Sequence, residues 1–340
     1  MFRKLLLALL FAFVSAQAAG ESQGNSTSCT SGYGNDYDLN FHIGGVFIVF
    51  AISGLGMFSS MYIDGFKLPI IGNVLQLLKM FGIGIIVSTA WIHLLPDAFS
   101  QFSNPCLSVG WQSYGTNYVG LFGVAASFMV QLLELASSQH THQHEYEYKD
   151  NETATVVQPA GETVFVLVDG TSAVKEKVEH APKKFQTVIL ESGILVHSLI
   201  IGLTLGVTPD SGFSTLLAAI CFHQMFEGMA LGVLVSNAEF DIRGKVLLGI
   251  MYPLTTPIGI AVGIAIRNQF NENNDSVILA QGILDSISAG ILFYNSYAEL
   301  ISNEINHSPS FKRYAKGFKT MCFFSMYLGA AAMAVVGIWA

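Results

Sequence analysis

The chain has 340 residues, of which 51% are hydrophobic and only 12% are charged, and its mean hydropathy is +0.50. Because a soluble domain carries about 25% charged residues, this composition excludes an ordinary water-soluble protein. The net charge of −8 says little about partners, because the charges are confined to loops and a few positions inside apolar stretches. No basic patch interleaved with aromatic residues is present, so nucleic acid is not expected as a partner.

The N-terminal stretch has the features of a secretory signal peptide, which we place at residues 1–19. Arg3 and Lys4 are followed by about ten apolar residues, and Ala16-Gln17-Ala18 resembles a cleavage site. A first membrane span is the alternative, but this apolar stretch is too short to cross a bilayer. Cleavage would leave residues 20–40 as a solvated tail outside the cytosol.

Apolar stretches long enough to cross about 30 Å of hydrocarbon follow along the chain. We therefore predict an all-α integral membrane protein with eight transmembrane helices. We place the spans at 41–62, 72–96, 117–138, 186–207, 212–236, 246–267, 276–301 and 319–339. The first three spans occupy 41–138 and the last five occupy 186–340, and the polar segment 139–185 between them is interpreted as a flexible cytosolic loop.

Lysine and arginine residues gather on one side of these spans, which predicts the orientation of the chain. The segments 63–71, 139–185, 237–245 and 302–318 hold most of them, whereas the outer segments hold only Arg267. This bias agrees with the signal peptide, so both termini are expected outside. We expect the plasma membrane, with a vacuolar or endosomal membrane as the alternative.

The four cysteines include no CxxC pair, which excludes a cysteine-based zinc ribbon. Cys29 and Cys106 both fall in outer segments, where oxidation is permitted, so a disulfide between them is a hypothesis. Cys221 and Cys322 lie inside apolar spans and are interpreted as inert packing.

Spans four and five carry ionisable residues, each of which needs an explanation because charge is expensive in hydrocarbon. His223 and Glu227 are four residues apart and therefore share one face of a helix. His197 lies about as far before the short turn between the spans as His223 lies after it, so both are expected at one depth. Two imidazoles and a carboxylate suit a cation such as Zn²⁺ or Fe²⁺. Two separate, structurally bonded histidines are the alternative.

Other residues are secondary candidates for a metal site or path. His93 and Asp97 repeat the four-residue spacing at the end of span two, where they either bind cations or form a polar helix end. The remaining candidates in the spans either line a path or make local contacts: Glu134, Glu191, Ser198, Gln224, Asp285 and Glu299. The cluster of His140, His142 and His144 is compatible with a weak zinc site or with a solvated loop.

Span six contains two prolines, Pro253 and Pro257, four residues apart. Each removes a backbone donor, so the freed carbonyl groups need a partner or a cavity at membrane depth. This pattern predicts either a packing kink or a flexible break that lines the substrate path, as in many transporters.

These segments resemble the ZIP family (Zrt-, Irt-like proteins) of zinc and iron transporters, in its fungal and plant branch. The resemblance rests mainly on two motifs, ILESGILVHSLIIGLTLG at 189–206 and FHQMFEGMALG at 222–232. Further matching stretches are YPLTTPIGIAVG at 252–263, ILDSISAGILFYNSYAELI at 283–301 and HLLPDAF at 93–99.

The resemblance implies a 3+2+3 arrangement with an inverted repeat, a homodimer, and metal transport toward the cytosol by an elevator-like shift of one helix group. It also implies that His197, His223 and Glu227 hold primary-site positions and that His93 lies beside them. Some relatives bind a second adjacent ion with residues at the positions of Ser198 and Ile201, so here a second ion is not expected.

The sequence therefore predicts a carrier of a divalent transition metal. Zn²⁺ is the foremost candidate, Fe²⁺, Mn²⁺ and Cd²⁺ are the others, and membrane lipids are the expected surroundings. No resident cofactor is expected. Three ligands plus water also describe catalytic zinc, so an intramembrane hydrolase is one alternative and a metal-sensing receptor is another. The lack of an HExxH motif favours the carrier over the enzyme.

Overall fold

A computed structural model describes Cys29 and residues 36–64, 69–149, 172–238, 240–268 and 270–338. The side chains of 63–71 and 137–183 lie outside this description. The described chain is helical and contains no strand, and eight of its helices are long and apolar enough to cross a membrane. The predicted signal peptide lies outside the described residues.

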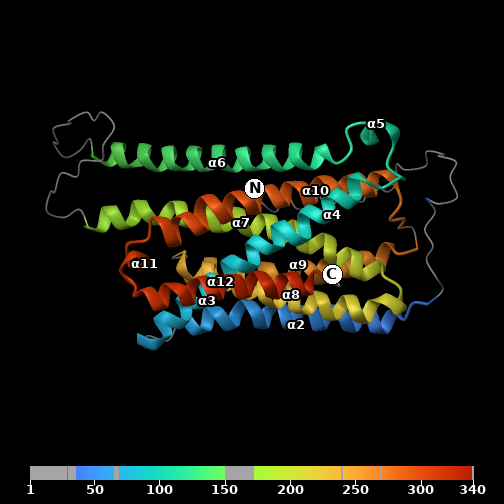
Figure 1. Ribbon diagram of the computed structural model, residues 1–340, viewed down its shortest axis with the longest axis horizontal. Helices are drawn as coiled ribbons and strands as arrows, with labels where there is room; N and C mark the ends of the chain where they lie inside the picture. Colours follow the sequence, from blue (N-terminus) through green and yellow to red (C-terminus); the bar gives the residue numbers. More distant parts are fainter. Residues whose placement is uncertain are drawn as a thin grey trace.

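The long helices lie side by side along the longest axis of the molecule, with α6 at one edge and α2 at the other (Figure 1). The short helices α5 and α11 lie at opposite ends, which we call the α5 end and the α11 end. The helix bounds are α2 Leu39–Asp64, α3 Pro69–Ser88, α4 Leu95–Phe102, α5 Val109–Gln112, α6 Asn117–Lys149, α7 Ser172–Val207, α8 Asp210–Asn237, α9 Ile242–Ile266, α10 Asp275–Tyr294, α11 Pro309–Arg313 and α12 Lys316–Val336.

Two of the spans are longer than predicted, and each of them contains a π-helix. In span two, η1 (Thr89–Leu94) joins α3 to α4, and the span continues to Phe102 rather than ending at residue 96. Pro96 does not stop it, because the proline falls in the first turn of α4, where a missing N–H is tolerated. In span seven, η2 (Asn295–Asn306) extends α10 beyond the predicted end at residue 301.

The polar segment 139–185 is helical at both ends, where we expected a flexible loop. Helix α6 continues to Lys149, and α7 begins at Ser172. The apolar pattern stops earlier than the helices do, because a helix beyond the hydrocarbon no longer needs apolar side chains. His140, His142 and His144 lie on the backbone of α6, and their side chains are outside the described residues.

The spans pack into two groups of four, and the cavities and candidate ligands described below lie along their interface. The first group consists of α2, α7, α8 and α9, in which α2 packs mainly on α8 and α7 on α9. The second group consists of α3 with η1 and α4, α6, α10 with η2, and α12, in which α3 packs on α12 and α6 on α10. Helices α3 and α8, and α7 and α10, make the main contacts between the groups.

These pairings have the symmetry of an inverted repeat. Exchanging span one with six, two with seven, three with eight and four with five leaves the set of main pairings unchanged. The two π-helices also obey the exchange, because η1 lies in span two and η2 in span seven. The 3+2+3 arrangement implied by the resemblance is therefore visible in the packing.

Close contact between α7 and α9 depends on small residues in both helices. A Cβ atom on Gly202 would overlap the carbonyl oxygen of Thr256, and a Cβ on Gly259 would overlap that of Leu199. Backbones that approach this closely are typical of membrane helices with small residues at the interface.

Helix α9 runs without interruption through Pro253 and Pro257, so the flexible break considered for span six is wrong. The side chain of Asp241 accepts a hydrogen bond from the Gly244 N–H and caps the start of this helix. Both prolines are buried, as expected if neighbouring helices satisfy the freed carbonyl groups.

The residues before α2 are attached to both helix groups at the α5 end. Cys29 forms a disulfide with Cys106, in the segment between α4 and α5 of the second group. Tyr37 donates a hydrogen bond to the Gly206 carbonyl (2.6 Å), and the Asp38 N–H donates to Asp210 (2.7 Å), both in the first group. The remaining cysteines, Cys221 and Cys322, are free.

Candidate metal centre

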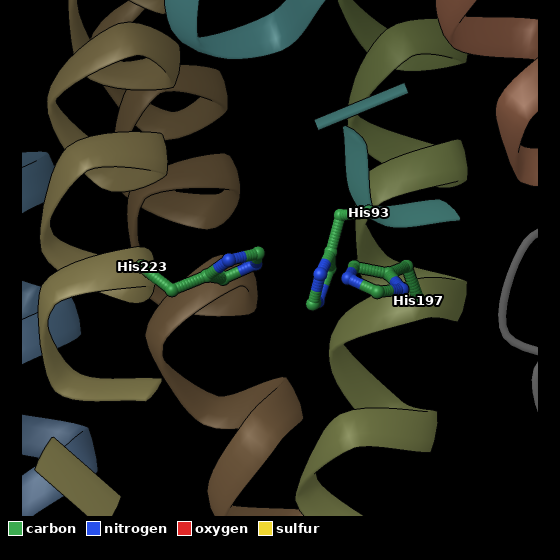
Figure 2. Close-up of side chains that lie close together, drawn as sticks. All are labelled: His93, His197 and His223. Carbon is green, nitrogen blue, oxygen red and sulfur yellow. The ribbon is translucent and has the colours of Figure 1, made fainter. Parts of the chain in front are cut away.

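Three histidine side chains from three different helices converge in the middle of the molecule. Figure 2 shows the His223 ring pointing toward His93 and His197. One ring nitrogen of each lies within 4.8 Å of those of the other two, and all three residues are buried. The ring centroids are separated by 5.0 Å for His93 and His223, 5.1 Å for His93 and His197, and 5.5 Å for His197 and His223.

The connection between α7 and α8 brings two of these histidines to the same level. Helix α7 ends at Val207 and α8 begins at Asp210, so the two helices are linked by a turn of two residues. His197 and His223 lie at similar distances from this turn, which is why the sequence predicted their common depth.

His93 lies in the π-helix η1, a placement that the sequence left open. A π-helix has i→i+5 hydrogen bonds and therefore changes the direction of the side chains that follow it. In η1 the His93 side chain is buried beside the other two rings rather than exposed at a polar helix end. The geometry places the His93 ring where one ion could contact it together with His197 and His223.

Glu227 completes the cluster on α8, one turn after His223. Its Oε2 atom is 3.4 Å from His223 Nε2, and its Oε1 accepts a hydrogen bond of 3.0 Å from the Thr89 hydroxyl. The side chains of Thr89 and Glu227 are both buried. Thr89 was not predicted from the sequence, because only the tertiary packing brings η1 against α8.

Asp285 on α10 is the other acidic group at the cluster. Its Oδ1 is 3.7 Å from His197 Nδ1, and both side chains are almost fully buried. The sequence marked Asp285 only as a residue that might line a path. Buried polar residues recur on α10 at helical spacing, at Gln281, Asp285 and Ser288, and this pattern could have indicated a polar face.

Several donor atoms of the cluster are buried and lack any hydrogen-bond partner. They are both ring nitrogens of His197 and of His223, and Oε2 of Glu227. Buried polar atoms are otherwise almost always hydrogen-bonded. Imidazole nitrogens and carboxylate oxygens are the atoms that bind Zn²⁺ and similar divalent ions, so this donor set fits such a cation.

A cavity of about 220 Å³ lies between the cluster and the α5 end. Its wall includes the three histidines, together with Asp97, Gln281 and Asp285. Carboxylates and amides next to the histidines give this cavity a surface that attracts cations.

A second cavity, of about 300 Å³, lies at the α11 end. It is lined by polar residues that include Lys79, Glu299 and Glu304, and the Lys79 Nζ atom lies 2.8 Å from a Glu304 carboxylate oxygen. Buried apolar side chains separate it from the histidines, because Ile194 and Leu190 precede His197 in α7 and Leu231 follows Glu227 in α8. The candidate centre is therefore closed toward the α11 end.

The other predicted candidates have surroundings of their own. The Tyr252 hydroxyl donates a hydrogen bond to Gln224, and the Gln224 side-chain amide donates one to the Thr256 hydroxyl. The Ser198 hydroxyl is buried without a hydrogen-bond partner. Glu191 is buried in α7, six residues before His197.

Glu134 and Glu299 belong to the α11 end of the second group. Glu134 accepts hydrogen bonds from Gln186 (3.0 Å) and from the Tyr294 hydroxyl (2.7 Å). Glu299 accepts one from Asn303 (2.8 Å) and lines the cavity at this end.

Comparison with known proteins gives matches along almost the whole chain. A family model described as "ZIP Zinc transporter" matches residues 39–337. "Zinc-regulated transporter 1" of Candida albicans is 33% identical over 313 residues, which cover 90% of this chain but only 62% of that relative. "Fe(2+) transport protein 1" of Arabidopsis thaliana is 27% identical over 340 residues, which cover 99% of this chain and 96% of the relative. "Probable zinc transporter 8" of the same plant is 31% identical over 272 residues, covering 79% and 77%.

Proposed function

The chain belongs to the ZIP zinc transporter family, a family of multi-pass membrane proteins that move divalent metal ions, and on that premise we propose that it carries Zn²⁺ toward the cytosol. The proposed site consists of His93, His197, His223 and Glu227. The observation that carries this assignment is the convergence of three buried imidazoles, with the Glu227 carboxylate 3.4 Å from His223 and with donor atoms of His197, His223 and Glu227 that lack hydrogen-bond partners.

The donor set suits transport because a carrier must bind its ion and then release it. Three of the four proposed ligands, His197, His223 and Glu227, belong to the first helix group, and the fourth coordination position is left to His93 of the second group or to water. Structural zinc sites, by contrast, are closed by four protein ligands that stay together. Imidazoles also favour zinc over the harder ions Mg²⁺ and Ca²⁺.

The position of the site supports an elevator-like shift of the two helix groups. His197, His223 and Glu227 belong to the first group, and His93 belongs to the second. A cavity reaches the cluster from the α5 end, which the distribution of basic residues assigns to the outside. Movement of the first group toward the α11 end would carry the ion to the cytosolic cavity.

The proposal extends to the metal, the membrane and the oligomeric state. Relatives named for zinc and for Fe(2+) both match this chain, and we propose Zn²⁺ because the matching family model is described as a zinc transporter. The plasma membrane is proposed from the signal peptide and the basic-residue bias. A homodimer is proposed from the family resemblance alone.

The first experiment measures uptake of radioactive zinc into liposomes that contain the purified protein. We expect His197→Ala, His223→Ala and Glu227→Ala each to reduce uptake by about tenfold or more, because each removes a metal ligand. The exposed His307 lies outside the site, and His307→Ala should leave uptake unchanged.

Unchanged uptake in His197→Ala, at equal protein density, would contradict the proposed site. Peptide or ester hydrolysis without zinc uptake would favour the intramembrane hydrolase. Zinc binding without accumulation would favour a receptor. Adding unlabelled Fe²⁺ or Mn²⁺ as competitors in the same assay measures selectivity.

A further inference from the structure

Two ligands of the proposed site are held by residues from the opposite helix group. Glu227 in the first group accepts its hydrogen bond from Thr89 in the second group, at 3.0 Å. The bond uses Oε1, whereas Oε2 faces His223 and has no hydrogen-bond partner. The Thr89 hydroxyl also lies 3.1 Å from the Ile85 carbonyl of its own span, so its one proton is shared between two acceptors. When the proton is donated to Glu227, it holds Oε1 and leaves Oε2 for an ion.

A second contact between the groups lies at His197. Asp285, in the second group, faces the Nδ1 atom of this imidazole at 3.7 Å, a charge contact that is too long for a hydrogen bond. A carboxylate beside one ring nitrogen of a histidine favours a proton on that nitrogen and leaves the other nitrogen for a metal. Asp285 therefore favours presentation of the Nε2 atom of His197 to the ion.

Both contacts cross the interface along which the two groups would move. Thr89 lies on η1 and Asp285 on α10, whereas their partners lie on α8 and α7. A displacement of about one helical turn, 5.4 Å, separates both pairs at once. His93 is left behind in the same step, because it also belongs to η1.

We propose that Thr89 and Asp285 are positioning residues that make the affinity of the site depend on the arrangement of the two helix groups. The site binds tightly while the groups are aligned as in this structure. It binds more weakly once Glu227 and His197 have moved away from these partners, which favours release at the α11 end. This inference rests on the proposed transport function and adds to it the cause of release.

The size of the effect can be anticipated from metal sites in general. Loss of a residue that orients a metal ligand lowers metal affinity by about 10–100-fold. A carrier needs such a difference between its two arrangements, because an ion bound equally well in both has no cause to leave.

The test compares Thr89→Val and Asp285→Asn with matched controls in the purified full-length protein. Thr89→Val removes the hydroxyl at nearly constant volume, and Asp285→Asn removes the charge. Ser88→Ala removes a neighbouring hydroxyl that bonds within the second group, to Ala330. Ser286→Ala removes one that bonds within its own helix, to Gly282.

We expect Thr89→Val and Asp285→Asn to raise both the zinc Kd and the uptake KM by about 10–100-fold, while kcat is retained. Thr89→Ser keeps a hydroxyl and should restore the wild-type Kd. Ser88→Ala and Ser286→Ala should match the wild type. Melting temperatures of all variants identify any that are merely unfolded.

Wild-type Kd and KM in folded Thr89→Val and Asp285→Asn would overturn the inference, as would a fall in kcat with an unchanged Kd. The proposed function fails separately, if the wild type does not accumulate zinc or if His197→Ala transports normally. Abolished uptake in His197→Ala together with unchanged Thr89→Val would reject only the positioning role.

Discussion

Glu191 is the buried acidic residue that the proposed site does not use. It lies six residues before His197 in α7, about 9 Å deeper along the helix axis at 1.5 Å per residue. Its side chain is buried, and neither carboxyl oxygen has a hydrogen-bond partner. An unpartnered carboxyl group among apolar side chains destabilises a fold, so its presence here is better explained by function than by packing.

Replacing Glu191 by methionine therefore separates stability from transport. We expect Glu191→Met to raise the melting temperature in detergent, because it replaces a buried polar group that has no partner by an apolar side chain of similar length. Zinc uptake should fall, because the residue lies between the site and the cavity at the α11 end. Wild-type uptake in the stabilised variant would show that Glu191 has no part in the path.

At this scale some residues of the proposed site could be predicted from the sequence and others could not, for physical reasons. The prediction of His197, His223 and Glu227 rests on helical spacing and a short turn, both of which are local properties. His93 remained undecided because no sequence pattern marks the π-helix that turns its side chain inward. Thr89 is an ordinary helix residue until α8 packs against it, and no local pattern marks such a residue.

At the scale of helices, the contact between α7 and α9 depends on glycine residues, which have no side chain. The backbones approach at Gly202 and Gly259 so closely that an added Cβ would overlap a carbonyl oxygen of the other helix. Helices in a membrane gain little hydrophobic stabilisation from association, so this close packing is a main source of their affinity.

We expect Gly202→Val to force α7 away from α9 and to lower the stability by about 1–3 kcal/mol, as overpacking does in other proteins. Gly54 in α2 has open space around it, and Gly54→Ala is the matched control, for which we expect no loss. Thermal unfolding in detergent measures both. An unchanged melting temperature in Gly202→Val would mean that the two helices can separate without loss.

Hydropathy located all eight spans, but it did not determine where the helices end. Hydropathy identifies continuous apolar stretches. The predicted span two therefore ended near Pro96, and the rest of helix α4, which is more polar, was not recognised as part of it. Hydropathy also missed the polar ends of α6 and α7, because a helix outside the hydrocarbon has no apolar signature.

At the scale of the whole molecule, the two helix groups are the units that the proposed mechanism moves. The groups meet through α3 and α8 and through α7 and α10. Composition and spacing alone did not reveal this division or the inverted repeat. Both are properties of how the spans pair, and at the level of sequence only the family resemblance implied the repeat.

A cross-link between the groups should stop transport without preventing zinc binding. Gly82 in α3 lies against Ala230 in α8, with an added Cβ at 3.0 Å from the Ala230 Cβ, so Gly82→Cys with Ala230→Cys can form a disulfide after a small adjustment. We expect oxidation of this pair to abolish uptake and to leave the zinc Kd unchanged, because the groups are fixed while the site stays intact.

The matched control joins two helices of the same group. The Ser88 hydroxyl bonds to the Ala330 carbonyl within the second group, so Ser88→Cys with Ala330→Cys cross-links α3 to α12. Uptake should survive this cross-link, since neither helix moves relative to the other. Equal uptake in both oxidised pairs would argue against movement of the groups.

The attachment of the residues before α2 limits how far such a movement can go. Cys29 is covalently bound to the second group through Cys106, whereas Tyr37 donates a hydrogen bond to the Gly206 carbonyl of the first group. The eight intervening peptide units from residue 29 to 37 can span at most about 29 Å when fully extended. This tether sets an upper limit to the displacement of one group against the other, and reduction of the Cys29–Cys106 disulfide would remove that limit.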